Sequence, residues 1–138
     1  MDLGGQALHI RVHSPAELRP FIEVFEAWMR DLGYPKRDLF AVRLALHEAA
    51  TNAFRHGNRR DCRKNIHVRY LLTTTQVVLE VTDQGRGFDP EQIPNSISEA
   101  YLDRPGGRGL FLMRAYMTRV SFHPDGNRVT LCRQRSNS

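Results

Sequence analysis

Three polar groups of residues in this sequence have types and spacing suited to chemistry, and the first is Glu48, Asn52 and His56. They follow one another at steps of four residues, so on an α-helix they share one face. An Asn oxygen can complete a Mg²⁺ shell made otherwise of phosphates and water, and Glu48 would then face an attacking group. The alternative is a solvated polar edge with His56 near the helix C-terminus.

The second group is Asp83-Gln84-Gly85-Arg86-Gly87, directly after an apolar run at 77–81. Strand parity places Asp83 on the same inward face as Val81, where a carboxylate needs a hydrogen-bond donor. An adenine amino group would serve as that donor. Gly85 and Gly87 would let the backbone approach a flat ligand, whereas an ordinary Asp-containing turn is the alternative.

The third group is Gly106-Gly107-Arg108-Gly109-Leu110, which opens a segment of helical periodicity. Main-chain N–H groups at a helix N-terminus attract anions, and glycines allow a phosphate close to the backbone. The same sequence is also typical of a flexible hinge, and both interpretations stay open on this motif alone.

The elements that must position these groups follow from the apolar periodicity. Alternation at 7–13 predicts a strand, and Ser14-Pro15-Ala16-Glu17 predicts the capped start of a helix that reaches about Leu32. A core stripe at three- and four-residue steps predicts a second helix over 36–56.

Further along, the pattern predicts two hairpins and one more helix. The expected strands are 66–72, 77–81, 120–122 and 129–131, the helix is 109–117, and 89–105 is a lid loop. The order β-α-α-β-β-loop-α-β-β predicts an α+β sandwich with a mixed, mostly antiparallel sheet covered by helices on one face. The tail from Gln134 is expected to fray.

Composition sets limits on the class of protein. The 138 residues, 41% hydrophobic and 25% charged, fit a single globular domain over 1–138. No apolar run is long enough to span a bilayer and no signal peptide is recognisable, so we expect a cytoplasmic protein. Cys62 and Cys132 are expected to be ordinary thiols. The basic residues behind the net charge of +5 are scattered and have no interleaved aromatic residues, so we do not expect direct nucleic-acid binding.

The order and spacing of the three groups resemble the N, G1 and G2 boxes of the Bergerat-fold, or GHKL, histidine-kinase-like ATPases. The resemblance covers nearly the whole chain. Within that superfamily, LHEAATNAFRHGN and GGRGLFLMRAYM are similar to the anti-sigma-factor serine kinases of the RsbW and sporulation type.

The resemblance implies a role for each matching residue. Glu48 would be the catalytic base, Asn52 would be the Mg²⁺ ligand, and Asp83 would bind the amino group of adenine. Further ATP contacts are implied for Gly85, Gly87, Gly107, Gly109, Leu110 and, on the last strand, Thr130. An arginine near the third group would contact the terminal phosphate, and Arg104 and Arg108 are both candidates.

The resemblance also implies a function, with ATP and Mg²⁺ as cofactors. The protein would be a transferase, a serine kinase that phosphorylates a STAS-type anti-anti-sigma protein and alternately holds a sigma factor, thereby regulating transcription, and it would be a homodimer. The alternative is a module of the same fold that uses ATP to grip a partner without appreciable phosphate transfer.

Overall fold

The sheet of this protein is five-stranded and antiparallel, in the order β1-β2-β3-β5-β4. It is seen in a computed structural model that describes residues 8–85, 107–123 and 127–137. The strands are β1 Leu8–Val12, β2 Ile66–Leu72, β3 Gln76–Thr82, β4 Arg119–Phe122 and β5 Arg128–Gln134. Every strand predicted from the sequence is present, within three residues of the expected ends.

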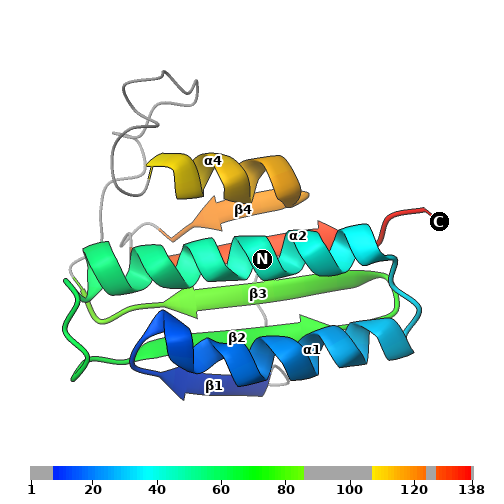
Figure 1. The fold of residues 1–138 in the computed structure, drawn as a ribbon. Helices are drawn as coiled ribbons and strands as arrows, with labels where there is room; N and C mark the ends of the chain where they lie inside the picture. Colours follow the sequence, from blue (N-terminus) through cyan, green and yellow to red (C-terminus); the bar gives the residue numbers. More distant parts are fainter. Residues whose placement is uncertain (1–7, 86–106, 124–126, 138) are drawn as a thin grey trace.

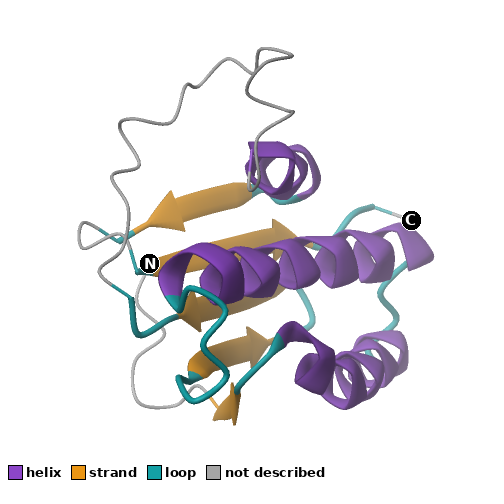
Figure 2. Cartoon of the chain, turned by 60° about the vertical axis from the view of Figure 1, so that its left-hand side comes forward, coloured by secondary structure: helices purple, strands orange, loops and turns teal. Residues whose placement is uncertain are grey.

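The helices lie on one face of this sheet (Figures 1 and 2). They are α1 Arg19–Asp31, α2 Lys36–Asn52 and α4 Gly107–Tyr116, with a 3₁₀ turn, η2 Pro15–Leu18, before α1 and a π-helical turn, η3 Ala53–Gly57, after α2. The long helix α2 crosses the middle of the sheet, and α4 lies beside β4. None of the described helices is long and apolar enough to span a membrane. The predicted α+β architecture is therefore confirmed.

The start of the first helix differs in detail from the predicted capping box. Ser14 is the N-cap residue but its side chain makes no capping hydrogen bond. Glu17 reaches one residue further back and accepts the N–H of His13 at 2.9 Å. The first turn is 3₁₀, and α1 begins at Arg19-Pro20, where proline has no N–H to donate to the preceding turn.

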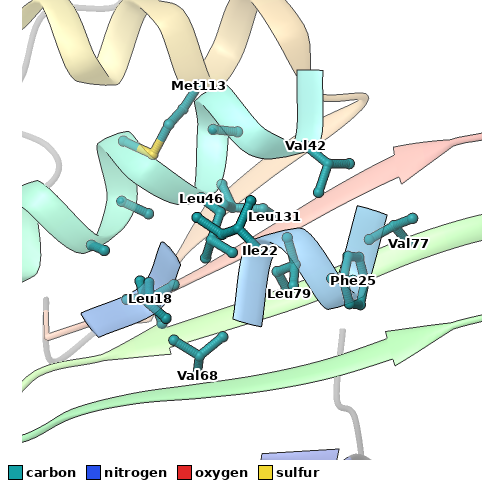
Figure 3. Close-up of a cluster of buried hydrophobic side chains, with 14 of the residues drawn as sticks. Leu18, Ile22, Phe25, Val42, Leu46, Val68, Val77, Leu79, Met113 and Leu131 are labelled. Atoms are coloured by element: carbon teal, nitrogen blue, oxygen red, sulfur yellow. The ribbon is translucent and has the colours of Figure 1, made fainter. Parts of the chain in front are cut away.

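The core lies between α2 and the covered face of the sheet. The predicted stripe of α2 is buried throughout, at Leu39, Val42, Leu46, Ala49 and Ala53. It packs with inward residues of the strands and with α1 and α4, as Figure 3 shows for Val68, Leu79, Leu131, Phe25 and Met113. This packing fixes the rotation of α2, so the polar residues of the same helix have fixed directions as well.

The C-terminal residues are attached to the domain, so the expectation of a frayed tail is wrong. The N–H of Arg135 donates to Thr75 O at 2.8 Å, and its guanidinium donates to Leu32 O at 2.9 Å and Gly33 O at 2.6 Å. Those two carbonyls lie at the end of α1, where helices lack internal partners. The arginine side chain therefore caps α1 from the far end of the chain.

A buried carboxylate ties the start of α2 to the same tail. Asp38 is fully buried and accepts hydrogen bonds from Arg133 Nε at 2.8 Å, Ser136 Oγ at 2.6 Å and Ser136 N–H at 2.9 Å. Burial raises the pKa of Asp38, but the hydrogen bonds from Ser136 and Arg133 outweigh it and hold the pKa below its ordinary value. We call this group, Asp38, Arg133 and Ser136, the N-terminal junction of α2.

Candidate functional site

Asp83 lies immediately after β3, on the covered face of the sheet as strand parity predicts. It is 9% exposed, and its N–H donates to Asn127 O at 2.9 Å. One carboxylate oxygen, Oδ1, accepts the N–H of Gly85 at 2.7 Å, while Oδ2 accepts no hydrogen bond from the described residues. Burial raises the pKa of Asp83 above its ordinary value, although the Gly85 hydrogen bond and the charge of Lys64 act in the opposite direction. Among the described residues, Oδ2 is therefore an acceptor without a donor.

Two glycines surround this carboxylate at very short range. A Cβ atom on Gly57 would lie 2.1 Å from Cγ of Asp83, and one on Gly85 would lie 2.0 Å from the carbonyl oxygen of Gly57. Neither position has room for any other residue without displacement of its neighbour. The π-helical turn η3 ends at Gly57, and such turns are frequent at functional sites.

A cavity of about 30 Å³ opens beside Asp83, between α2, α4 and the strands β3, β4 and β5. Its walls are largely apolar and carry few polar groups. The residues that line it are Ala49, Asn52, Ala53, Gly57, Val81, Asp83, Met113, Phe122, Asn127, Arg128 and Val129. This volume holds about one water molecule, so a planar base enters only if the walls separate. Apolar walls with few polar groups are typical of sites for flat ligands.

The second part of the site lies where α2 meets the first turn of α4. A Cβ atom on Gly109 would lie 2.7 Å from Oε2 of Glu48 and within 3.5 Å of both polar atoms of the Asn52 side chain. Neither Glu48 nor Asn52 makes a side-chain hydrogen bond with the described residues. The structure therefore brings the first and third sequence groups together, with two polar side chains directed at a helix N-terminus that attracts anions.

The donor set bears on which metal the site could hold. Within the described segments no three His, Cys, Asp or Glu side chains gather in a way that could bind a metal ion. A metal here would take most of its ligands from a substrate and from water, which is how Mg²⁺ binds in phosphate-transferring proteins. The Asn52 oxygen beside Gly109 fits that arrangement.

Two residues expected to contact the ligand have side chains that do not line the cavity. Thr130 pairs with Glu80 and Ser121, on the sheet face opposite the helices, while Val129 lines the cavity. The two-residue period of β5 is the reason, because only the neighbours of Thr130 point inward. The side chain of Leu110 is 3% exposed and belongs to the core.

His56, which the sequence places on one face with Glu48 and Asn52, belongs to the π-helical turn η3 and not to α2. Its side chain is exposed and does not line the cavity. Burial, followed by the charges of Arg55 and Arg60, lowers the pKa of His56.

Several predicted residues lie outside what the structure describes. The expected lid at 89–105, Gly87 and Arg104 all belong to the segment 86–106. Gly107 and Arg108 are described only by their place in the first turn of α4. The choice between Arg104 and Arg108 as a phosphate contact therefore stays a prediction.

Three residues of the site were missed by sequence reasoning: Gly57, Asn58 and Asn127. Gly57 and Asn58 lie just past the helix predicted over 36–56, and Asn127 lies between the strands predicted at 120–122 and 129–131. Asn58 is fully buried, and the Asn127 side chain donates to Asp83 O at 3.4 Å. A polar residue beside each chain reversal was the available signal, but it does not indicate which distant segment such a residue contacts.

Comparison with known proteins places this geometry in a family. Residues 12–133 match the histidine kinase-like ATPase domain. The chain is 30% identical over 106 residues to the serine-protein kinase RsbW of Bacillus licheniformis, an alignment that covers 68% of this chain and 62% of that protein. It is 34% identical over 96 residues to the serine/threonine-protein kinase BtrW of Bordetella bronchiseptica, with 67% of this chain and 68% of that protein covered.

A solved structure supports the fold independently. The RsbU and RsbW domains of Rv1364c from Mycobacterium tuberculosis superpose with a TM-score of 0.62 at 20% identity, over 96% of this chain and 33% of that one. The alignments to the RsbW kinases span 62 to 63% of those proteins' length. Sequence match, fold and the meeting of the three motifs agree: this chain belongs to the histidine kinase-like ATPase family.

Proposed function

We propose that this protein is an ATP-dependent protein-serine kinase and anti-sigma regulator. Its protein substrate is a STAS-type anti-anti-sigma protein, its alternate partner is a sigma factor, and the active form is a homodimer in the cytoplasm. The observation that carries the proposal is the pair Glu48 and Asn52, without partners among the described residues and directed at Gly109 in the first turn of α4. Similarity to proteins named RsbW and BtrW serine kinases supports the choice of reaction.

The base end of the site is suited to adenine. Oδ2 of Asp83, which accepts no hydrogen bond from the described residues, would accept one from the exocyclic amino group of the base. Gly57 and Gly85 leave the carboxylate accessible to a flat ring. The apolar walls at Val81, Met113 and Val129 would cover the faces of the ring.

The phosphate end of the site lies one helical turn further along α2. The Asn52 oxygen would hold Mg²⁺ together with the phosphates, and N–H groups of the first turn of α4 would bind phosphate oxygens. The metal supplies neutralisation of the phosphate charge. Phosphate transfer has a loose transition state, so this chain contributes chiefly by positioning and by electrostatics.

Glu48 would act on the substrate serine. Its carboxylate lies beside Gly109, where it can accept a hydrogen bond from a serine hydroxyl and hold the oxygen in line with the terminal phosphate. The serine oxygen forms the new bond to phosphorus, the bond to the ADP oxygen breaks, and the serine proton passes to Glu48. Positioning a general base in this way contributes typically about 10²- to 10⁴-fold in rate.

The decisive experiment measures binding and transfer separately. The protein is titrated with Mg-ATP and then incubated with labelled ATP and candidate STAS partners. Saturable ATP binding with label on a partner serine supports the proposal. ATP-dependent partner binding with no transfer would establish the alternative, a binding module that uses ATP as a conformational ligand. Absence of ATP binding at millimolar concentration would overturn both.

A further inference from the structure

Asn58 is a buried polar residue that neither the motifs nor the proposed chemistry uses. It follows the π-helical turn at the end of α2, and its side chain is 0% exposed. Its Oδ1 accepts the N–H of Gln84 at 2.8 Å, and its Nδ2 donates to Asn65 O at 3.0 Å. Its N–H donates to Ala53 O at 2.8 Å. One side chain thus joins the end of α2, the entry to β2 and the exit of β3.

The link to Gln84 matters because of what lies on each side of it. Asp83 precedes Gln84, and Gly85, whose N–H orients the Asp83 carboxylate at 2.7 Å, follows it. Asn127 holds the N–H of Asp83 from the other side. The main chain that presents the carboxylate is therefore fixed at two points, Asn58 and Asn127.

The packing around Gly57 shows why this fixation has little tolerance. Asp83 and Gly85 approach Gly57 so closely that added Cβ atoms would lie 2.1 Å and 2.0 Å from the facing atoms. Gly57 is the immediate neighbour of Asn58, so one residue holds both surfaces in register. A shift of about 1 Å at a reacting or recognising group is enough to change binding strongly.

We infer that Asn58 is the positioning residue for base recognition: it sets the direction of the Asp83 carboxylate and thereby the preference for adenine over guanine. This rests on the proposed function, because it assumes that the site binds a nucleotide. Glu48, Asn52 and Gly109, at the phosphate end, make no hydrogen bond to Asn58. Loss of Asn58 is therefore expected to affect the base end alone.

The test uses three ligands that separate the two ends: ATP, GTP and inorganic tripolyphosphate, each with Mg²⁺. Asn58→Ala is expected to weaken ATP binding about tenfold and to leave GTP and tripolyphosphate binding within about twofold, so that the ATP to GTP preference falls by nearly the same factor. A purely structural role would weaken all three ligands together or none. Either result would overturn the inference.

Gln84→Ala is the matched control. It removes the side-chain bond from the N–H of Asn65 to the Gln84 side-chain oxygen but keeps the main-chain N–H that Asn58 accepts. Its ATP to GTP preference is expected to equal that of the wild type, and an equal loss in both variants would contradict a specific role for Asn58. If Asn58→Ala does not fold, Asn58→Asp, which keeps an oxygen for the Gln84 N–H, is measured instead. It should retain more of the preference than any folded variant whose side chain has no acceptor, such as Asn58→Leu.

The wild-type titration distinguishes the two proposals. If the wild type binds none of the three ligands, the proposed function fails and the inference fails with it. If the wild type prefers ATP and Asn58→Ala keeps that preference, the inference alone is wrong.

Discussion

A buried carboxylate lies at each end of α2, and the two carboxylates differ in their hydrogen bonding and in the direction of their pKa shifts. At the N-terminal junction, Asp38 accepts hydrogen bonds on both oxygens from Arg133 and Ser136. At the other end, Asp83 has one oxygen bonded to Gly85 and one without a partner in the described chain. The pKa of Asp38 lies below its ordinary value and that of Asp83 lies above it.

We interpret Asp38 as a polar group that maintains the fold and Asp83 as a polar group that binds a ligand. A buried carboxylate with full hydrogen bonding stabilises the folded state, whereas burial of a carboxylate with few hydrogen bonds costs stability, as the raised pKa of Asp83 indicates. Glu48 and Asn52, near the same end of α2 as Asp83, extend the second class. The N-terminal junction should therefore control stability, and the far end of α2 should control binding and transfer.

The largest expected effect is on phosphate transfer, at the C-terminal end of α2. Glu48→Gln keeps the shape of the side chain but removes the charge that accepts the serine proton, so phosphate transfer should fall about 10²- to 10⁴-fold while ATP affinity stays within a few-fold. Transfer to a STAS partner and ATP titration measure the two quantities. Asn52→Ala is the contrast, because loss of a metal ligand should weaken Mg-dependent binding and transfer together. Transfer by Glu48→Gln at the wild-type rate would exclude Glu48 as the base.

The next largest effect is on stability at the N-terminal junction. Asp38→Ala leaves the Arg133 guanidinium, 17% exposed, without its carboxylate, and such a change typically costs about 3 to 5 kcal/mol of unfolding free energy. Denaturant unfolding measures the loss, and ATP affinity is measured where the variant is still folded. Ser136→Ala should cost less, because Arg133 keeps its partner. A large loss of ATP affinity in folded Asp38→Ala would contradict the assignment of stability to the N-terminal junction and of binding to the other end of α2.

The third prediction concerns Asp83 itself. Asp83→Asn should weaken ATP binding about tenfold or more, since a hydrogen bond to a charged acceptor is worth about 1.5 to 3 kcal/mol. Unfolding free energy at pH 7 should stay equal or rise by up to about 1 kcal/mol, because the substitution removes an incompletely bonded buried charge. Thermal melts without nucleotide, compared with ATP titrations, give both values. A clear loss of stability would show that Asp83 maintains the fold as Asp38 does.

The sequence was sufficient for the parts of this arrangement that depend on local periodicity. Strand parity predicted that Asp83 faces inward, and helical spacing placed Glu48 and Asn52 on one face. These two predictions need only the regular geometry of one element. That the first and third groups share a site was implied by the family resemblance, and the structure places Gly109 beside Glu48.

The parts that were missed depend on irregular backbone or on distant partners. The π-helical turn at Ala53–Gly57 ends with Gly57 against Asp83, and no pattern in the sequence signals it. Thr130 was assigned by resemblance against the parity of its own strand, and the parity was right. Arg135 and Asn58 bind main-chain atoms far away in the sequence, which only tertiary packing specifies.

The smallest expected effect, a dependence of stability on pH, compares the two carboxylates directly. Because the folded-state pKa of Asp38 is lowered, its contribution to stability is present above the unfolded-state value, about 3.9, and is lost as the pH falls through the folded value. The stability gap between the wild type and Asp38→Asn should therefore persist down to about pH 4 and close only below it. Asp83 has a raised pKa, so its ionisation lowers stability, and this penalty disappears as the pH falls toward about 4 from above. The gap between the wild type and Asp83→Asn should have the opposite sign and close at higher pH than the Asp38 gap. Denaturant unfolding of the three proteins between pH 7 and about pH 3 measures both gaps. If both close in the same pH range with the same sign, the two ends of α2 do not differ in the way that their hydrogen bonds indicate.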